Sequence, residues 1–414
     1  MLERSGARGP HRSVARQSWL GGAGHEHVQG GEGNRVYDLV IIGGGVWGVA
    51  AALAAVESRQ GSVLLLEAQP AVASESSAKA GGIVSDMVAN PDDQQWVRRS
   101  RELFRVAHAA SGDSTMIRQD GMLSLGPASH RPLMADHVAS LRSRQIPVEE
   151  WSADDIQRHF PQLDRVDDTL YGVWTPHDWH VNPTAYAFAA LARAKALGLA
   201  VRLSYRVQRL HIEDREVQIE GPDDPIHAAR VLVAAGTWTR KLTQTAGIDL
   251  PFRPYRTQLA SLDVAGGYDL PIVRHLATDL YLVPDGPHNL LVGDGTQLWE
   301  HDPDDYRTTG DPAFELEVAA GLLALSSRGE QARIRRSWAG LCGATPDRRP
   351  LIGAVCERVW VACGDSGFGI KRGPAIGELA AQIALGVAPQ PPHLLPHRFA
   401  TVDFALRPGS GGSL

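Results

Sequence analysis

The chain has 414 residues, 43% of them hydrophobic, and a formal net charge of −6 at pH 7. This length is enough for two domains that share an interface, and the composition suits a folded α/β protein. The negative charge gives no electrostatic reason to expect nucleic acid or an anionic membrane as a partner. The cysteines lack metal-ligand spacing and indicate a reducing cytoplasm rather than a disulfide framework; they are Cys342, Cys356 and Cys363.

Residues 1–35 are rich in Gly, Arg and His and contain almost no apolar run. They lack the hydrophobic centre of a secretory signal, so we predict a disordered N-terminal extension or an over-long start. An organelle transit peptide fits less well, because Glu3, Glu26 and Glu32 interrupt the segment. Residues 406–414 are predicted to form a flexible tail.

The next segment has the pattern of a strand, a glycine turn and a helix. Leu39–Ile42 is a β-branched apolar run, typical of a strand buried on both faces. Gly43, Gly45 and Gly48 follow in G-x-G-x-x-G spacing, and Val49–Val56 is Ala-rich like a closely packed helix. The first glycine allows the tight turn, and the second allows a pyrophosphate to approach the backbone. The third allows the helix to pack closely on the strand.

A second apolar run, Val63–Leu66, ends at Glu67, which lies 67 − 43 = 24 residues after the first glycine. An acid at this position accepts hydrogen bonds from ribose hydroxyls and argues against a 2′-phosphate. We therefore predict that the segment binds a dinucleotide. The uncharged run 39–56 is just long enough to span a membrane, but three consecutive glycines make a poor helix interior, which disfavours a span.

The rest of the chain alternates predicted helices and strands. The loop 73–83 combines hydroxyls and small residues, so it can run beside a phosphate and a flat ring. Helices are predicted at residues 94–110, 130–144, 151–160, 185–197 and 315–325. Strands are predicted at 120–126, 199–212, 230–236 and 359–362, an antiparallel region at 251–292, and a loop at 338–353. A glycine-fronted helix starts near Lys371, with Pro374 in its first turn.

Two histidines, His177 and His180, lie between aromatic residues. The two histidines could bind a metal ion as a pair. Histidines without a carboxylate or cysteine nearby in the sequence are more often pocket or surface residues. We predict no metal.

Four motifs in this order resemble the D-amino-acid oxidase superfamily of flavoproteins, closest to its glycine oxidase and monomeric sarcosine oxidase branches. They cover roughly residues 36–405 and are the glycine motif with Glu67, Val233-Ala-Ala-Gly-Thr-Trp, Thr345-Pro-Asp-x-x-Pro-Leu-Ile-Gly and Gly364-x-Ser-Gly-x-Gly-x-Lys. The resemblance implies FAD and an α/β fold in which a Rossmann-like FAD-binding domain is interleaved with an α+β substrate domain containing a largely antiparallel sheet. The implied boundaries are 36–85, 175–250 and 335–405 for the FAD-binding domain, and 86–174 and 251–334 for the substrate domain.

The activity implied by the resemblance is oxidation of an amine C–N bond by hydride transfer to flavin N5, giving an imine that water hydrolyses. Dioxygen commonly takes the electrons afterwards. The lysine at the position of Lys371 pairs with the substrate carboxylate in the sarcosine oxidase branch, and Tyr281 matches a pocket-lining aromatic residue. We expect these cofactor-binding residues: Gly43, Gly45, Val46, Trp47, Gly48, Glu67, Ser76, Ser77, Gly82, Ile83, Val207, Gly236, Trp238, Gly367, Gly369, Ile370 and Lys371.

Three positions depart from the family pattern. Gly340 stands where the sarcosine oxidase branch attaches its flavin to a cysteine, so we predict non-covalent FAD. Cys342 stands at the position where glycine oxidases have a carboxylate-binding arginine. Leu291 stands at the position where sarcosine oxidases have the lysine that activates oxygen. A dehydrogenase that uses another electron acceptor therefore stays open.

Three other functions remain as alternatives. They are a nicotinamide-dependent dehydrogenase, a flavin-binding subunit without its own turnover, and a tailoring oxidase of a larger secondary metabolite. The first is disfavoured because it does not explain the glycine-rich helix start near the C-terminus. The sequence leaves the substrate, its stereochemistry, the electron acceptor and the oligomeric state open.

Overall fold

The computed structural model describes residues 35–88 and 90–399. Apart from Arg35, the predicted N-terminal extension lies outside these ranges, as does the predicted tail. The described helices are α1 (Val46–Glu57), α2 (Pro91–Ser111), α3 (Arg131–Ser143), α4 (Ala153–His159), α5 (Pro183–Ala196), α6 (Thr239–Gln244), α7 (Pro312–Leu325) and α8 (Gly373–Ala384).

A six-stranded sheet carries the predicted glycine turn. Its order is β10 (Ala200–Arg202), β3 (Val63–Leu66), β2 (Leu39–Ile42), β14 (Val231–Val233), β22 (Val359–Cys363) and β21 (Leu351–Ala354). Neighbouring strands are parallel except for β21, which is antiparallel to β22. The predicted strand, turn, helix and second strand are confirmed as β2, α1 and β3, so the uncharged run 39–56 is not a membrane span.

Both faces of this sheet are covered, which explains why β2 and β3 are buried at every residue. Leu39 and Ile41 point into a core formed with α1, α5 and α8. Val40 and Ile42 point into the core on the opposite face. That face is covered by a four-stranded sheet in the order β1 (Val36–Tyr37), β13 (Ile226–Ala228), β12 (Val217–Glu220) and β11 (Arg209–Ile212).

A nine-stranded sheet forms the second large layer. Its order is β19 (Leu298–Trp299), β15 (Arg253–Asp263), β18 (Asn289–Gly293), β17 (Tyr281–Pro284), β16 (Ile272–His275), β6 (Met122–Pro127), β8 (Leu170–Thr175) and β7 (Glu149–Trp151), with β20 (Arg333–Ala344) also paired to β15. The pairs are antiparallel except β16 with β6. The predicted fold class, a parallel Rossmann-like sheet beside a largely antiparallel one, is confirmed.

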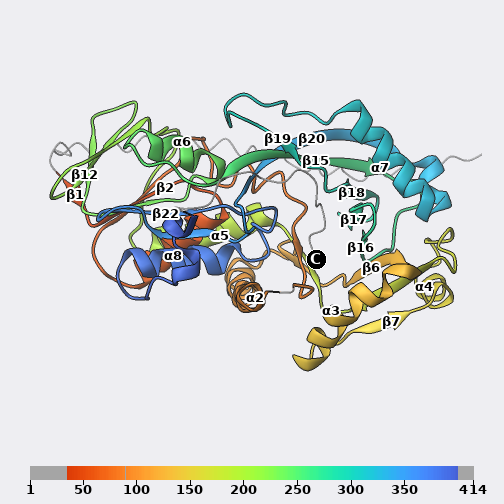
Figure 1. Cartoon of the computed structure of the whole chain (residues 1–414). Helices are drawn as coiled ribbons and strands as arrows, with labels where there is room; N and C mark the ends of the chain where they lie inside the picture. Colours follow the sequence, from red (N-terminus) through yellow and green to blue (C-terminus); the bar gives the residue numbers. More distant parts are fainter. Residues whose placement is uncertain (1–34, 89, 400–414) are drawn as a thin grey trace, which may run out of the picture. The chain divides into compact units, whose positions relative to one another are not determined.

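The prediction of a loop at residues 338–353 is wrong over most of its length. β20 continues to Ala344 and pairs with β15 from end to end, and the two strands run side by side in Figure 1. Two glycines in this stretch make room for packing. A Cβ at Gly340 would lie 3.1 Å from Lys79 Cβ, and one at Gly343 would lie 3.1 Å from the Phe252 ring.

The remaining predicted helices are present. Ser152 caps α4 in a capping box with Asp155, as expected from their spacing. Asn182 caps α5, which begins two residues earlier than predicted, and Gly198 follows it with φ +99°. A small sheet in the order β4 (Ile83–Val84), β9 (Trp179–Val181) and β5 (Ile117–Arg118) joins the loop after residue 80 to the segment that contains His180.

Candidate active site

A cavity of about 700 Å³ is lined by the carboxyl end of β2, the start of α1, the loop before α8, and β15 and β20. Cavities of this size hold cofactors and substrates in many proteins. Every predicted site residue except Gly48 lines it: Gly43, Gly45, Val46, Trp47, Glu67, Ser76, Ser77, Gly82, Ile83, Val207, Gly236, Trp238, Tyr281, Gly367, Gly369, Ile370 and Lys371. The fold therefore gathers these residues from distant parts of the chain into one cavity.

The glycine turn presents the start of α1 to the cavity. Gly43 has φ +109°, and a Cβ there would lie 2.5 Å from the Ala234 carbonyl oxygen. Gly48 lies behind the turn, where a Cβ would meet the Gly43 oxygen at 1.8 Å. A Cβ at Gly45 would have only Ser77 Oγ nearby, at 3.5 Å, and no side chain caps α1 at this residue. The positive end of the helix dipole thus faces open space suited to an anionic group.

Glu67 lies at the end of β3, beside the glycine turn. Its carboxylate accepts the Gly44 N–H at 2.6 Å and the Gln69 N–H at 2.7 Å. Burial raises the pKa of Glu67, and these two hydrogen bonds oppose that shift. The backbone therefore holds the carboxylate in place at the cavity wall.

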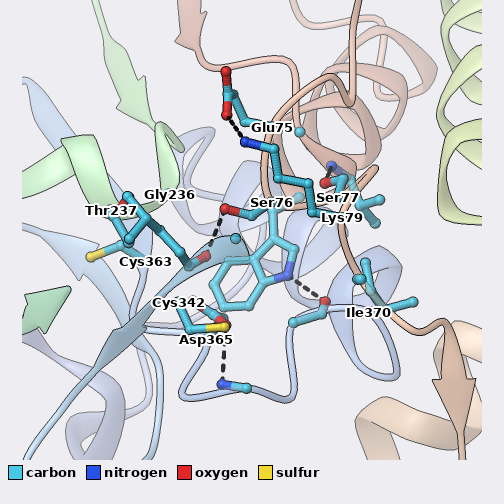
Figure 2. A pocket seen from close by; sticks show the side chains of 18 of the residues that line it. Glu75, Ser76, Ser77, Lys79, Gly236, Thr237, Cys342, Cys363, Asp365 and Ile370 are labelled. Atoms are coloured by element: carbon cyan, nitrogen blue, oxygen red, sulfur yellow. Dashed lines mark hydrogen bonds and ion pairs between the residues drawn. The ribbon is translucent and has the colours of Figure 1, made fainter. Parts of the chain in front are cut away.

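The loop after β3 is tied to α1 and to β20. Ser77 Oγ accepts the Val46 N–H at 3.2 Å, and Ser76 Oγ donates to the Leu341 carbonyl oxygen at 2.7 Å. Figure 2 shows both serines on the wall of the cavity. The loop thereby connects the two large sheets across the cavity.

Lys79, in the same loop, lines the cavity and was missed by the sequence reasoning. Its ammonium donates to Glu75 at 2.7 Å and to the Tyr306 hydroxyl at 2.8 Å, and Figure 2 shows Lys79 reaching toward Glu75. Burial opposes its charge, but these two hydrogen bonds leave the pKa of Lys79 above its ordinary value. The sequence signal for Lys79 was its position four residues after Glu75 in a loop of small residues.

The loop before α8 is fastened from both sides. Trp47 Nε1 donates to the Gly369 carbonyl oxygen at 2.8 Å. The buried guanidinium of Arg372 donates to the Asp365 carbonyl oxygen at 2.8 Å and forms an ion pair with Asp93 on α2. These contacts fix the backbone that carries Lys371.

Lys371 lines the cavity, and its ammonium has no carboxylate partner among the described residues. The ammonium lies 4.9 Å from the centroid of the Phe368 ring, and no described residue forms a hydrogen bond or ion pair with it. Burial, followed by the positive charge of Arg274, lowers the pKa of Lys371 to about 8. An anionic ligand would compensate this charge.

Tyr281 opens β17 and packs between two glycines. A Cβ at Gly293 would lie 2.3 Å from the Tyr281 hydroxyl, and one at Gly81 would lie 3.3 Å from its ring. Burial raises the pKa of Tyr281, so the phenol is protonated at neutral pH. The ring is thus held firmly in the cavity wall.

Four further residues at this end were not predicted as site residues, although Cys342 was noted as a departure. They are Tyr255, Arg274, Cys342 and Asp365. Tyr255 and Cys342 are ladder partners on β15 and β20. Burial and the nearby Asp365 carboxylate hold the pKa of the Cys342 thiol well above its usual range. The available signal for Arg274 was a cation directly after the apolar pair Ile272 and Val273.

Another part of the cavity lining contains Val207, Gly236 and Trp238. Trp238 Nε1 donates to Asp304 at 2.8 Å. The hydroxyl of Thr237, shown beside Gly236 in Figure 2, is buried and has no hydrogen-bond partner among the described residues. This part of the lining therefore offers a polar group to a ligand.

His177 Nδ1 is 2.9 Å from Gln119 Nε2, and burial lowers the pKa of His180 to about 4. Within residues 35–88 and 90–399, no group of three or more His, Cys, Asp or Glu side chains is arranged to hold a metal ion. None of the helices described in those ranges is long and apolar enough to cross a bilayer.

A glycine turn between a buried strand and a helix, followed by an acid at the end of the next strand, defines a dinucleotide-dependent protein of the Rossmann type. A family model, DAO, described as FAD dependent oxidoreductase, matches residues 38–383 of the chain. The chain belongs to this family and is an FAD-dependent enzyme, which confirms the resemblance found in its motifs.

The chain is similar to characterised members of this family. It is 26% identical to N-methyl-L-tryptophan oxidase of Salmonella arizonae, over 85% of this chain and 96% of the relative. It is also 26% identical to 4-methylaminobutanoate oxidase (formaldehyde-forming) of Paenarthrobacter nicotinovorans, over 84% of this chain and 44% of the relative. The crystal structure of L-proline dehydrogenase from P. horikoshii shares the fold, with a TM-score of 0.80, 23% identity, and coverage of 88% of this chain and 98% of that one.

Proposed function

We propose that the protein oxidises the C–N bond of a small amine or amino acid that carries a carboxylate. The observation that carries this proposal is the ammonium of Lys371, which lines the same cavity as Tyr281 and has no carboxylate partner among the described residues. The names of the two relatives contain N-methyl-L-tryptophan and 4-methylaminobutanoate. Both compounds combine an amine with a carboxylate. The substrate proposed here belongs to the same chemical class.

The residues of the cavity fit FAD. The start of α1, with Gly45 at its N-cap, suits the pyrophosphate, and Glu67 suits the ribose hydroxyls. The unpartnered hydroxyl of Thr237 offers a further hydrogen bond. The remaining predicted cofactor residues line the same cavity, apart from Gly48, which supports the turn from behind.

Bound here, FAD would supply the acceptor for a hydride from the carbon beside the substrate nitrogen, and water would hydrolyse the imine product. In this proposal Lys371 binds the substrate carboxylate and so orients the amine. Tyr281 forms the side wall of the substrate site and remains a neutral phenol, because burial raises its pKa. The start of α8, two residues after Lys371, adds a positive dipole end close to this lysine in the chain.

We further propose that dioxygen or another acceptor takes the electrons and that the enzyme works in the cytoplasm. Leu291, at the family position of the oxygen-activating lysine, is a buried residue on β18. The three cysteines are free thiols, which fits a reducing compartment. The interleaved domain boundaries remain our proposal, supported by the six-stranded sheet, whose strands come from separate segments of the chain.

The proposed function is tested by the absorption spectrum of the purified protein and its response to amines without oxygen. N-methyl-L-tryptophan, 4-methylaminobutanoate and their neutral amides serve as probes. We expect the flavin bands to bleach with at least one carboxylate and less with its amide. A flavin that none of these amines bleaches would contradict the proposal.

Acid precipitation is expected to release FAD into the supernatant. Gly340 has no side chain to attach a flavin, and a Cβ at this position would approach Lys79 Cβ to 3.1 Å. Cys342 is the nearest cysteine in sequence, and burial keeps its thiol protonated by raising its pKa. The measurement is the absorbance of the supernatant and of the redissolved pellet; yellow colour that stays in the pellet would contradict non-covalent binding.

Glu67→Ala is expected to weaken FAD binding while the fold survives. Losing a buried acceptor costs on the order of 1–3 kcal/mol, which is about a ten- to hundred-fold change in Kd. Flavin content after dialysis of dilute protein measures the effect. Glu67→Gln is the matched control, because it retains an oxygen for the Gly44 N–H; full occupancy of the Ala variant would remove Glu67 from the FAD site.

A further inference from the structure

Residues 300–311 join β19 to α7 without forming a helix or a strand. The segment is fastened to the nine-stranded sheet near both of its ends. The Glu300 N–H donates to the Pro254 carbonyl oxygen on β15 at 3.0 Å. The Ala339 N–H on β20 donates to the Thr308 carbonyl oxygen at 2.8 Å. Backbone contacts therefore fix the ends of the segment.

Asp304, in the middle of this segment, lies at the rim of the cavity, because it lines the cavity and is also exposed to solvent. Its carboxylate accepts hydrogen bonds from Lys241 Nζ at 2.7 Å, Trp238 Nε1 at 2.8 Å and Arg206 Nη1 at 3.2 Å. These three donor residues line the cavity as well. Lys241 belongs to α6 and Arg206 follows β10, so the carboxylate ties the segment to two separate parts of the cavity lining.

Two further side chains hold the segment, on either side of Asp304 in the sequence. Asp302 accepts from Lys241 Nζ at 2.9 Å, and the Tyr306 hydroxyl accepts from Lys79 Nζ at 2.8 Å. Asp302 and Tyr306 do not line the cavity. Burial opposes the charge of Asp304, but hydrogen bonds, above all from Lys241, leave its pKa below the ordinary value. Charged and polar contacts thus hold the middle of the segment at the cavity rim.

Contacts of this kind open more easily than the backbone contacts at the two ends. Exposed ion pairs contribute little individually, because water and salt compete for both charges. The four charged side chains of this contact are between 38% and 53% exposed; they are Arg206, Lys241, Asp302 and Asp304. A segment with fixed ends and exposed closing contacts can swing away from the rim while the sheets that carry it stay folded.

We propose that residues 300–311 form a lid on the FAD cavity, and that FAD enters and leaves when Asp302, Asp304 and Tyr306 release their partners. The lid contacts join protein groups to one another, so they oppose opening for entry and for release. The closed lid therefore slows both processes by the same factor and leaves the affinity for FAD nearly unchanged. This inference concerns the cofactor and is independent of which substrate is oxidised.

Asp304→Asn is expected to speed FAD release and FAD entry together, each about three- to ten-fold, because the amide keeps the shape and loses the charge. Release is measured in the holoenzyme as the exchange of bound FAD for isotopically labelled FAD. Entry is measured by flavin fluorescence after apoprotein prepared from the holoenzyme is mixed with FAD. The dissociation constant is expected to change little, since both rates change by the same factor.

Tyr306→Phe tests the lid without altering the cavity lining. The variant loses only the hydroxyl that binds Lys79, and Tyr306 does not line the cavity. Both rates are expected to rise about two- to ten-fold, the effect of losing one hydrogen bond. Equal melting temperatures of the variant and wild-type apoproteins show that the fold is intact.

The matched control is Asp249→Asn. Asp249 accepts hydrogen bonds at 2.7 and 3.0 Å from Arg240, the neighbour of Lys241 on α6. Asp249 is exposed, and neither residue of this ion pair lines the cavity. This variant is expected to exchange FAD at the wild-type rate.

Two results would overturn the inference. Faster release with unchanged entry in Asp304→Asn would mean that Asp304 binds the cofactor directly. Wild-type rates of release and entry in both lid variants would mean that the segment does not control access to the cavity.

Discussion

Gly48→Ala is expected to purify with little or no FAD. The added Cβ would lie 1.8 Å from the Gly43 carbonyl oxygen and 2.9 Å from its carbonyl carbon. Both are backbone atoms of the turn, so α1 has to move away from β2 and its start no longer faces the cavity. Overpacking of this kind costs about 1–3 kcal/mol, and sometimes more. Flavin content after gel filtration and thermal unfolding of the apoprotein measure the two effects.

Gly45→Ala tests FAD binding separately from the packing of the glycine turn. A Cβ at Gly45 makes an ordinary contact with Ser77 Oγ at 3.5 Å and otherwise faces the cavity. The apoprotein is expected to melt as the wild type does, while FAD binding weakens because a methyl group enters the space for the pyrophosphate. If Gly48→Ala retained full FAD, the turn would not be the phosphate site. Equal melting of the Gly48 variant and the wild type would contradict the packing argument.

Lys371→Met is expected to slow flavin reduction by a carboxylate substrate about ten- to hundred-fold at low substrate concentration. The variant loses a charge-assisted hydrogen bond worth roughly 1.5–3 kcal/mol. FAD content should change little, because the ammonium faces substrate in the proposed site. Anaerobic stopped-flow reduction with a carboxylate and its amide measures the effect, and the amide should be almost unaffected.

A different result would assign Lys371 to the flavin itself. If the ammonium lies against the flavin edge, the variant should slow reduction by every substrate equally and lower the reduction potential, because a cation that favours reduced flavin is lost. Wild-type rates with both substrates would remove Lys371 from the site.

The same lysine should make carboxylate binding depend on pH. Burial and the charge of Arg274 lower the pKa of Lys371 to about 8, so in the ligand-free enzyme its positive charge is present below this pH and lost above it. Indole-3-acetate, a carboxylate without an amine, stays anionic throughout. Its affinity, measured by perturbation of the flavin absorbance, is expected to fall about tenfold per pH unit above the pKa of the lysine. The fall should be absent in Lys371→Met, because methionine carries no charge to lose.

The sequence alone determined the parts of the fold that depend on neighbouring residues. The spacing of Gly43, Gly45 and Gly48 after a four-residue apolar strand determines a strand, turn and helix, because each glycine meets a local steric demand. Ser152 and Asp155 determined the start of α4 in the same way, through a capping box. These features need no contact from elsewhere in the chain.

Features that depend on distant partners were decided only by the tertiary structure. Residues 338–344 were part of a predicted loop, yet pairing with β15 makes them a strand, and the space at Gly340 serves Lys79. Arg274 carried no motif, and its place in the cavity comes from the pairing of β16 with β17. Backbone hydrogen bonds between strands depend little on side-chain identity, so the chain's local pattern does not reveal which strands pair. The residues that face one another across the cavity are determined by that pairing.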